Sequence, residues 1–514
     1  MLHYLKDSAS LLPFMKLQPV YAAEDFLHGT EVLEVDDGLR PIPIISTAII
    51  GLIGTAPDAD ASKFPLNEPV AIVGNPREAA YLDPDDEGNG TLKDAIDAIF
   101  DQGGATVVVV RVEEGSGVDE TMSNIMGDLT QGSGVWAFLE AQSKVHLKPK
   151  VLVAPGFMYK RLDNGVISYA MSQVGSGYDP DNPPSVTVTD TGSPGAGAGA
   201  TAKAVVNTSG QVESVEVQRS GSNYSEVTVT IDAPVESGGV QATATGTIGD
   251  AGNPVVAEMQ GIADRLRAVI IADGPSTTDV AAITYRGDWG SKRIFVVDPN
   301  ILVYDTDLDS HVPQPTSPRV AGLISRVDND RGFWWSPSNQ ILNGVTGIAR
   351  PITFNISDRD SQANYLNKNE VATVIRYDGF RLWGNRCTAT DPLWAFLSVR
   401  RTADAVYDSI EEAFLWAIDR PFSAQLLVDI ADSVNAFLRH LVSVGAIING
   451  KAWLDPTLNT PDQLQQGKLY VDFDIEPPAP LEHLIFRAHR NGEYYEELVA
   501  DAIRTLETRV ATTV

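Results

Sequence analysis

The stretch TLKDAIDAIFDQGGATVVVVRV, residues 91–112, decides the fold class of this chain. Its first half predicts a helix over residues 91–101, because apolar side chains spaced three and four residues apart share one helical face. These side chains are Leu92, Ala95, Ile96 and Ile99. Its second half, residues 106–112, is mostly valine, which is typical of a strand buried on both faces of a sheet. The stretch therefore predicts a helix followed by a strand of an α/β sheet.

The same alternation extends in both directions along the chain. Short apolar runs predict further strands, and amphipathic stretches between them predict helices. The expected strands are 70–74, 151–154, 269–272 and 294–297, and the expected helices are 135–145, 257–268 and 277–289. Strands that are apolar along their whole length need helices on both faces of the sheet. We therefore expect a discontinuous α/β core that comprises residues 46–163 and 254–375.

Residues 164–253 interrupt this pattern with a composition rich in Gly, Ser, Thr and Val. The segment is internally repetitive. Gly175-Ser-Gly-Tyr178 returns as Gly221-Ser-Asn-Tyr224, and a Val-Thr-Val-Thr unit occurs at both 186–189 and 227–230. Two copies of a turn followed by an alternating strand predict a small all-β module. We expect this inserted module to project from the surface, because insertions into surface loops cost little closure entropy.

Residues 376–467 hold the helical part of a C-terminal domain. Two amphipathic helices are expected over 402–419 and 424–444, and Gly445 is suited to end the second one. After them, residues 468–475 alternate apolar and acidic side chains, which predicts a half-buried strand. Helices and strand together indicate an α+β domain.

We expect both ends of the chain to form extended arms, over residues 1–45 and 468–514. The first arm mixes β-forming and charged residues, and the second continues past three prolines into a predicted strand at 483–489 and a helix from Glu493. Half-apolar strands in arms favour pairing with another chain, because an exposed strand edge has unpaired backbone groups. The apolar residues of these predicted inter-subunit strands are Val32, Leu33, Val35, Leu469, Val471, Phe473, Ile475, Leu484 and Phe486.

The charge balance excludes several function classes as first interpretations. The chain has 38 Lys and Arg against 68 Asp and Glu, a formal net charge of −30 at pH 7. Such an acidic surface repels phosphate backbones and anionic lipids, so we expect no nucleic-acid binding. It also makes identical copies repel one another, so their assembly must rest on packing and pairing. The longest apolar stretch, 41–54, is about half of what a membrane-spanning helix needs, so we expect no membrane insertion.

The sequence contains no pattern that indicates catalysis, a cofactor or a metal. It has neither a Gly-x-Ser-x-Gly nucleophile elbow nor a Gly-x4-Gly-Lys-Ser/Thr phosphate loop. We interpret its one cysteine, Cys387, as a buried or incidental thiol and not a catalytic one, which suits a protein folded in a reducing cytoplasm. A metal pair at His483 and His489, or a cation loop at 83–87, is less favoured than surface histidines and a solvated loop. We therefore expect a protein that is not an enzyme.

Three stretches of the chain carry a more specific signal. They are residues 28–40 leading to 46–56, residues 318–339, and residues 379–386 continued by 398–401 and by the expected strand 469–475. These stretches resemble the contractile phage tail sheath family, and most of all the sheaths of P2-like phages and R-type pyocins. The residues that carry this family signature are Ala321, Gly322, Arg326, Asp328, Gly332, Trp334, Pro337, Asn339, Trp383 and Gly384.

The resemblance implies a structural subunit of a contractile tail sheath in a bacteriophage virion, assembled in the bacterial host cytoplasm. Such subunits form stacked hexameric rings in a helical assembly around an inner tail tube, and β-strand exchange between terminal arms links them. The implied partners are further copies of the chain, the tail tube protein, and baseplate and tail terminator proteins. Contraction is expected to drive the tube through the host envelope for DNA ejection, without a cofactor.

Several alternatives stay open at this point. The sheath could belong to a bacteriocin or another contractile injection system. An α/β enzyme with a carbohydrate-binding module, or a surface-binding adhesin that uses residues 164–253, is less favoured. Trp334 and Trp383 are interpreted as anchors of a core or an interface. The side chains of Arg400 and Arg401, like those of Arg319, Arg326 and Arg331, pair either with a neighbouring subunit or the tube, or within the chain.

Overall fold

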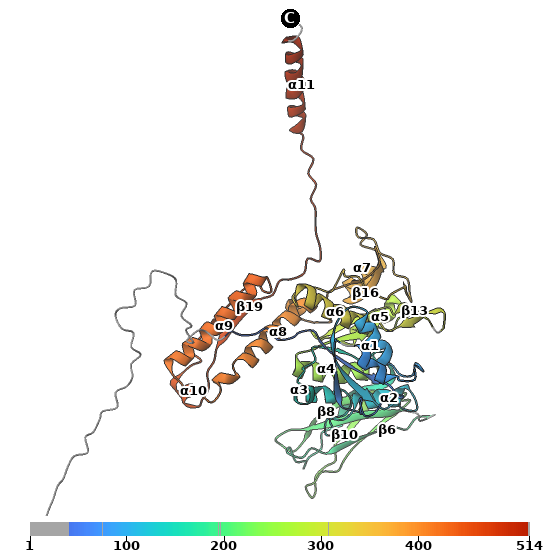
Figure 1. Ribbon diagram of the computed structural model, residues 1–514. Coiled ribbons are helices and arrows are strands. Elements are labelled where there is room, and N and C mark those ends of the chain that lie inside the picture. The colour runs from blue at the N-terminus through green and yellow to red at the C-terminus, as the bar shows by residue number, and fades with distance from the viewer. Residues whose placement is uncertain (1–40, 75, 194, 196, 307, 512–514) are drawn as a thin grey trace, which may run out of the picture. The chain divides into compact units, whose positions relative to one another are not determined.

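A computed structural model describes residues 41–511, except residues 75, 194, 196 and 307 (Figure 1). The chain divides into two units, Met1–Pro41 and Ile42–Val514. The predicted arm strand with Val32, Leu33 and Val35 therefore lies outside the described residues. All structural statements below concern the second unit.

The first core of this unit is an eight-stranded sheet with the order β17-β16-β12-β11-β4-β1-β3-β2. Its six inner strands are parallel, and β2 and β17 run antiparallel at the two edges. The strands are β1 (Ile49–Thr55), β2 (Pro69–Val73), β3 (Thr106–Val112), β4 (Val151–Val153), β11 (Val269–Asp273), β12 (Ile294–Val297), β16 (Val371–Arg376) and β17 (Phe380–Trp383). The valine run is strand β3, as predicted.

Helices cover both faces of this sheet. A side chain at Gly51 of β1 would meet Phe138 of the 3-10 helix η2 (Gly134–Glu140), and one at Gly54 would meet Leu92 of α1 (Leu92–Phe100). Successive side chains of a strand alternate between the faces, so these two contacts lie on opposite sides. α6 (Ser317–Arg331) packs on α1, while α2 (Val118–Met126) and α4 (Pro254–Leu266) pack with η2. The mixed α/β class is thereby confirmed.

Two predicted core helices differ in detail from what forms. Residues 135–145 form η2 and the short helix α3 (Ala141–Val145) instead of one α-helix. A 3-10 turn places residues three apart on the same side, and Val135 and Phe138 are both buried. α4 begins earlier than predicted, because Asn253 caps it by accepting the Val256 N–H at 3.1 Å. The remaining elements are η1 (Pro76–Leu82), α5 (Asp279–Gly287), α7 (Gln362–Lys368), β13 (Ile301–Asp305), β14 (Ser310–Gln314) and β15 (Gly347–Ile348).

Residues 162–251 form two further sheets, β10-β5 and β8-β7-β6-β9. The strands are β5 (Leu162–Gln173), β6 (Ser185–Asp190), β7 (Ala198–Val206), β8 (Val212–Ser222), β9 (Val227–Ile231) and β10 (Thr243–Ala251). Strands β5 to β7 form the first sequence repeat, and β8 to β10 form the second. The third strand of each repeat pairs with the first strand of the other, β7 with β8 and β10 with β5. The equivalent tyrosines make equivalent contacts: the Tyr178 hydroxyl accepts the Ala242 N–H, and the Tyr224 hydroxyl accepts the Ala200 N–H. The repeat in the sequence is therefore also a repeat in the structure.

A second hydrophobic core lies between α8 (Leu397–Ala413), α9 (Ala424–Val444), β18 (Asn449–Trp453) and β19 (Asp472–Glu476). α9 has the predicted bounds, with Ser423 accepting the Leu426 N–H at its start and Gly445 left-handed at its end. α8 begins five residues before its predicted start and ends at Ala413, followed by the 3-10 helix η4 (Leu415–Ala417). The prediction missed its first turn because two buried arginines there interrupt the amphipathic pattern.

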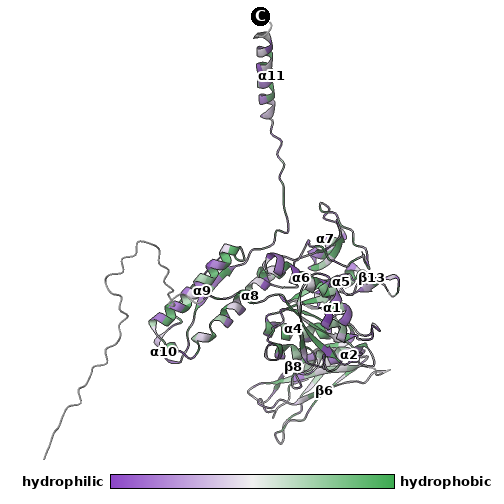
Figure 2. Ribbon diagram, in the orientation of Figure 1, coloured by the Kyte–Doolittle hydropathy of each residue, from purple (hydrophilic) through white to green (hydrophobic). Residues whose placement is uncertain are grey.

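The last described residues follow a different course from the prediction. β19 begins at Asp472, after the short helix α10 (Pro461–Gln465), and not at residue 468. Residues 481–493 form no strand, which corrects the strand predicted at 483–489, because no neighbouring strand satisfies their backbone groups here. α11 (Tyr494–Ala511) follows, with apolar and polar residues intermixed (Figure 2). Among the described helices, none is long and apolar enough to cross a membrane.

Candidate functional site

The signature residues lie on α6, on the loop after it and around the end of β17. Ala321 and Gly322 lie in the buried part of α6. A Cβ atom added at Gly322 would be 2.5 Å from the carbonyl oxygen of Ile99 in α1. Arg326, about one turn further on, donates to the backbone carbonyls of Gln102 and Ile341. This face of α6 is therefore built for close contact with α1.

Replacing Gly322 by Ala is expected to destabilise the fold by about 1–3 kcal/mol, because the added methyl group pushes α6 away from α1. Gly261→Ala is the matched control: Gly261 lies within α4, and an added Cβ there meets no atom within 4 Å. The control is expected to be neutral or stabilising by up to about 1 kcal/mol. Urea denaturation measures both, and equal stabilities would contradict the close packing of α6 on α1.

The loop after α6 reaches from the first core to the second and then returns to β17 of the first. Gly332 ends α6 with a φ of 105°, and its N–H donates to the carbonyls of Val327 and Asp328. Phe333 is buried in the second core, and the ring of Trp334 meets it edge-to-face at 5.1 Å between centroids. Trp334 is therefore a core anchor in this chain. Pro337, further along the loop, is also buried.

Asn339, Trp383 and Gly384 hold the end of this loop against β17. Asn339 has a left-handed φ of 61°, and its N–H donates to the Leu382 carbonyl at 2.6 Å. The N–H of Gly384 donates to the Ser338 hydroxyl at 3.1 Å. The Trp383 ring packs edge-on against Phe354, with 4.9 Å between centroids. These signature residues thus set the backbone course and packing inside the chain.

Asp328 connects α6 to α8. Its carboxylate accepts Arg401 Nη1 at 2.9 Å and the Thr47 hydroxyl at 2.7 Å. Arg401 also donates to the Thr47 carbonyl at 3.0 Å. The side chains of Asp328 and Arg401 are only 3% and 5% exposed, so the pair is shielded from solvent. One carboxylate therefore joins two helices to the segment that precedes β1.

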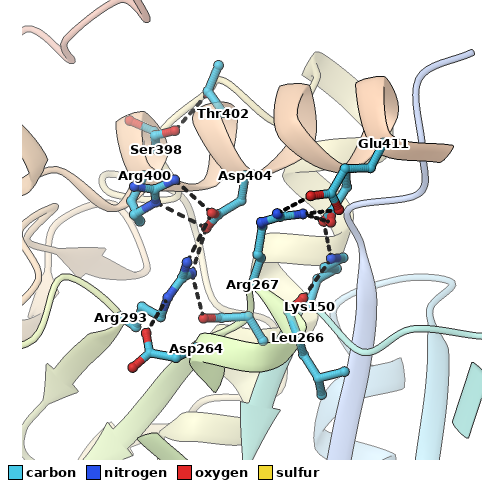
Figure 3. Close-up of polar contacts among 12 residues, drawn as sticks. Lys150, Asp264, Leu266, Arg267, Arg293, Ser398, Arg400, Thr402, Asp404 and Glu411 are labelled. Atoms are coloured by element: carbon cyan, nitrogen blue, oxygen red, sulfur yellow. Dashed lines mark hydrogen bonds and ion pairs between the residues drawn. The ribbon is translucent and has the colours of Figure 1, made fainter. Parts of the chain in front are cut away.

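Asp404, one turn along α8, lies in a second buried ion cluster (Figure 3). Its carboxylate accepts Arg293 Nη1 at 2.7 Å, Arg293 Nη2 at 3.1 Å, and Arg400 Nη2 at 2.7 Å. Arg293 also donates to the more exposed Asp264 at 2.9 Å. The side chains of Arg293, Arg400 and Asp404 are at most 7% exposed. Asp404 is thus a buried carboxylate that neutralises two buried guanidinium groups.

Asp408 continues the same face of α8. Its carboxylate is paired with Lys150, with Lys148 at 3.0 Å, and with Arg267 at 2.8 Å. Burial lowers the pKa of Lys150 to about 8, against the opposing effect of its hydrogen bond to Asp408. Burial acts to raise the pKa of Asp408, but hydrogen bonds from Lys150, Lys148 and Arg267 outweigh it and hold that pKa below its usual value. Arg267 also pairs with Glu411. Residues 401, 404, 408 and 411 follow helical spacing, so one face of α8 is bonded to the first core.

These contacts bear on the two alternatives left open for the arginines. Arg400 and Arg401 pair within the chain, as does Arg319, which reaches Asp101 at 3.1 Å. Arg326 donates hydrogen bonds to two backbone carbonyls. The guanidinium group of Arg331 lies over the Trp335 ring, with 5.3 Å from Cζ to the ring centroid. Arg319, Arg400 and Arg401 thus form ion pairs within the chain, while Arg326 and Arg331 make intrachain contacts of other kinds.

The β18–β19 sheet has one occupied edge and one open edge. On the side of β18 away from β19, Asn435 of α9 accepts the Ala452 N–H at 2.8 Å and donates to the Ala452 carbonyl at 2.9 Å. Because the N–H and C=O of one strand residue point the same way, Asn435 occupies the place of a further strand. β19 has β18 as its one strand neighbour among the described residues. Within the described part of the chain, its outer edge has no strand partner.

Some of the predicted C-terminal arm residues pack against their own chain, and others are exposed. Val471, Phe473 and Ile475 pack against the second core of their own chain, while Leu469 precedes the strand. Leu484 and Phe486 are 59% and 86% exposed. Exposed apolar side chains continue along α11, where they are Tyr494, Tyr495, Leu498, Val499, Ile503 and Leu506. The chain after Glu482 therefore carries apolar surface that its own fold leaves uncovered.

In the part of the chain that the structure describes, few groups are suited to catalysis or metal binding. No cluster of three His, Cys, Asp or Glu there could hold a metal ion. Cys387 is buried, and burial raises its pKa to about 12, which makes the thiol a poor nucleophile. His483 and His489 are exposed on the segment without secondary structure.

Three family models match the chain. The phage tail sheath protein central domain matches residues 222–388, and the phage tail sheath C-terminal domain matches residues 389–490. The tail sheath protein Gp18 domain III N-terminal region matches residues 47–112. The matches extend over both cores.

Curated relatives match nearly the whole length. The chain is 31% identical over 479 residues to the putative prophage major tail sheath protein of Pseudomonas aeruginosa (strain UCBPP-PA14), covering 92% of this chain and 99% of that protein. It is 30% identical to the tail sheath protein of Escherichia phage P2, covering 92% and 98%. It is 32% identical to the tail sheath protein of Burkholderia phage BcepMu, with the same coverages.

Solved structures share the fold at lower identity. The helical sheath of the anti-feeding prophage in its contracted state aligns with a TM-score of 0.55 and 16% identity, over 90% of this chain and 99% of that one. The contracted sheath of the extracellular contractile injection system PVC aligns with a TM-score of 0.55 and 14% identity, over 91% and 98%.

Proposed function

Because this chain belongs to the phage tail sheath protein family, we propose that its copies form stacked hexameric rings around a tail tube. It is a structural sheath protein of the contractile type. In the proposed assembly, terminal arms exchange β-strands between subunits, and contraction drives the tube through the host envelope. The proposed parts are the N-terminal arm (1–45), the α/β core (46–163 and 254–375), the inserted module (164–253), the C-terminal helices (376–467) and the C-terminal strand and arm (468–514).

One observation carries the proposal of strand exchange. Among the residues that the structure describes, no strand pairs with the outer edge of β19, and the same chain bears an exposed half-apolar segment after Glu482. A strand added to an open edge gains backbone hydrogen bonds, and the alternation of its side chains sets the register. Backbone pairing also does not depend on net charge, so it suits copies that each carry −30. Each copy thus offers both halves of the proposed contact.

The ion clusters on α8 bear on the proposed contraction. They bond α8 to the first core through Asp328, Asp404 and Asp408. We infer that the two cores of a subunit move together as a rigid body during contraction, and that the arms act as hinges. The free-energy difference between the extended and contracted sheath then comes from contacts between subunits, and not from refolding of the subunit.

The proposed partners follow from the same assembly. They are further copies of the chain, the tail tube protein, and baseplate and tail terminator proteins. We propose that the subunit is assembled in the bacterial host cytoplasm and resides in the virion as tail sheath. A bacteriocin or other injection device remains the second candidate, because the fold is shared with injection-system sheaths.

Negative-stain electron microscopy of the overexpressed chain tests the proposed assembly. Long striated tubes or sleeves are the expected result, because arm exchange between copies propagates in one direction. Small monodisperse particles at every concentration would contradict it. Sedimentation of the same samples gives the polymerised fraction.

Deleting the inserted module is expected to leave tube formation intact, if the module only decorates the outside. Leu162 and Ala251 pair at the base of β5 and β10, so a short Gly-Ser link can replace residues 164–249 without disturbing the core. Arg161 keeps its pair with Asp288 at 2.7 Å in this variant. Electron microscopy measures the outcome, and a variant that folds yet forms no tubes would place the module in an assembly contact.

A further inference from the structure

The C-terminal arm does not leave its own subunit where β19 ends. β19 ends at Glu476, and Glu482 is then bound to Arg386, which follows β17 of the first core. We propose that the Arg386–Glu482 pair is a latch that holds the root of the arm, residues 477–482, on its own subunit, so that the arm begins to bend at residue 483. This inference rests on the proposed strand exchange only for the effect of the latch on assembly.

The Arg386 side of the latch is held in place by contacts other than Glu482. The backbone beside it is fixed to the segment that leads into α8, because the Cys387 N–H donates to the Ala395 carbonyl at 2.7 Å. The guanidinium group lies over the Phe396 ring, with 4.8 Å from Cζ to the ring centroid. The face of an aromatic ring attracts a cation at this distance. The guanidinium group is therefore positioned to bind a carboxylate.

Glu482 meets this guanidinium group through both of its carboxylate oxygens. Arg386 donates from Nε to Oε1 at 2.9 Å and from Nη2 to Oε2 at 2.6 Å. Two parallel hydrogen bonds of this kind fix the orientation of the pair as well as its distance. Glu482 also lies with Val371 and Gly384 around one small crevice of the first core. The pair therefore ties the segment that follows the second core to the first core.

In the described chain, few other contacts hold the root of the arm. Pro477 is buried, but Leu481 is 78% exposed. Residues 478–481 take part in no hydrogen bond with the described chain, and two of them are prolines, which have no N–H to donate. The position of the root thus depends on the contact at Glu482.

Past Glu482 the character of the chain changes. Residues 483–493 form neither helix nor strand, and Leu484, Ile485 and Phe486 are all more than half exposed. A segment with little burial and no ladder of hydrogen bonds is the part of a fold that moves most easily. The change from a held to a free backbone therefore falls directly after Glu482.

A held root favours assembly, because docking of an arm on another copy then need not order residues 477–482 as well. Ordering a free backbone opposes binding, and a segment that is ordered beforehand avoids that loss. The side chains of Arg386 and Glu482 are 35% and 40% exposed, so the contribution of their pair is modest. The latch is expected to lower the critical concentration for tube formation by up to about fivefold, equivalent to ~1 kcal/mol.

Distances between spin labels in the unassembled full chain test the latch. One label is placed at Leu481→Cys in the root, and the other at Leu393→Cys in the 3-10 helix η3 (Pro392–Trp394), since both side chains are exposed. The native Cys387 is buried and need not be replaced. The measurement is made below the concentration at which tubes form, so it reports on the single chain.

A narrow distance distribution is expected with the native latch and a broad one with Arg386→Glu. The swapped pair, Arg386→Glu with Glu482→Arg, is expected to restore the narrow distribution. With the second label at Leu498 in α11 instead of Leu481, the distribution is expected to be broad in every variant, because Leu498 lies past the bend. Equal widths at Leu481 with and without Arg386→Glu would overturn the latch, and a narrow distribution at Leu498 would overturn the bend at residue 483.

Sedimentation of the same variants, without labels, gives the effect on assembly. Arg386→Glu is expected to raise the critical concentration by up to about fivefold, and the swapped pair to return it to the unmodified value. Lys144→Glu is the matched control, because it changes the net charge equally. Lys144 is 40% exposed and pairs with Glu140 four residues before it, so its pair joins no separate segments. Equal critical concentrations for Arg386→Glu and Lys144→Glu would overturn the role in assembly.

Two further variants keep the result unambiguous. Glu482→Ala opens the latch without a change in the first core, and is expected to match Arg386→Glu in both measurements. A chain that lacks residues 483–514 keeps the latch but has no arm. Tubes from that chain would contradict the strand exchange, whereas the latch is decided by the distances in the unassembled chain.

Discussion

Removal of residues 483–514 is expected to leave a folded chain that forms no tubes. The removed residues bury little within their own chain, since Leu484, Phe486 and the large apolar side chains of α11 from Tyr494 to Leu506 are more than half exposed. Their loss therefore costs the folded subunit almost nothing. In the proposed assembly the same residues supply the strand that covers β19 of the next copy, so each contact between copies loses its backbone hydrogen bonds. Electron microscopy and sedimentation measure the effect.

The position of the cut decides whether this experiment is informative. A deletion from residue 468 would also remove β19, whose Val471, Phe473 and Ile475 pack in the second core, and would unfold part of the subunit. A cut after Glu482 keeps β19 and the Arg386–Glu482 pair. An unchanged thermal unfolding curve is the control for folding. Normal tubes from the shortened chain would contradict arm exchange, and so would normal tubes after deletion of residues 1–40.

Asp404→Ala is expected to cost about 3–5 kcal/mol of stability, the largest loss from a single substitution that we foresee. The substitution leaves the guanidinium groups of Arg293 and Arg400 buried without their shared carboxylate. Attraction within a buried pair offsets the cost of removing each charge from water, so the loss of one partner exposes the full cost of the others. Urea denaturation measures the free energy of unfolding.

Asp264→Ala is the matched control, because Asp264 pairs with the same Arg293 but its side chain is 59% exposed. Ion pairs with an exposed partner contribute at most about 1 kcal/mol. Asp404→Asn keeps the shape of the side chain but removes its charge. Its loss of stability is expected to lie between those of Asp404→Ala and Asp264→Ala. If Asp404→Ala and Asp264→Ala cost the same, the cluster does not bind α8 to the core in the way the burial implies.

The sequence alone predicted the α/β class and most of the elements of the first core. Residues 91–112 show why: helical and strand periodicities are local, and seven valine-rich positions in β3 admit few other structures. The bounds of α9 were also local, set by Ser423 and Gly445 at its two ends. The family resemblance came from short motifs around residues 318–339, whose spacing is readable without any structure.

The tertiary structure decided what those motifs do. No spacing in the sequence shows that Gly322 lies against Ile99, that Asp328 meets Arg401, or that Asp404 neutralises Arg293. These partners are 73 to 223 residues apart, and contacts at such separations depend on how the sheet brings distant segments together. The same holds for the first turn of α8, which the hydrophobic pattern missed because its buried residues are charged.

The predicted strands of the C-terminal arm show what the sequence determines and what depends on the folded structure. Alternation of side chains predicted strands at 468–475 and 483–489, yet only β19 forms in the single chain. β19 has a neighbour, β18, to take its backbone hydrogen bonds, and residues 483–489 have none. Alternation therefore determined which face each side chain takes, while the presence of a partner strand, a property of the folded molecule and its neighbours, decided whether the strand exists.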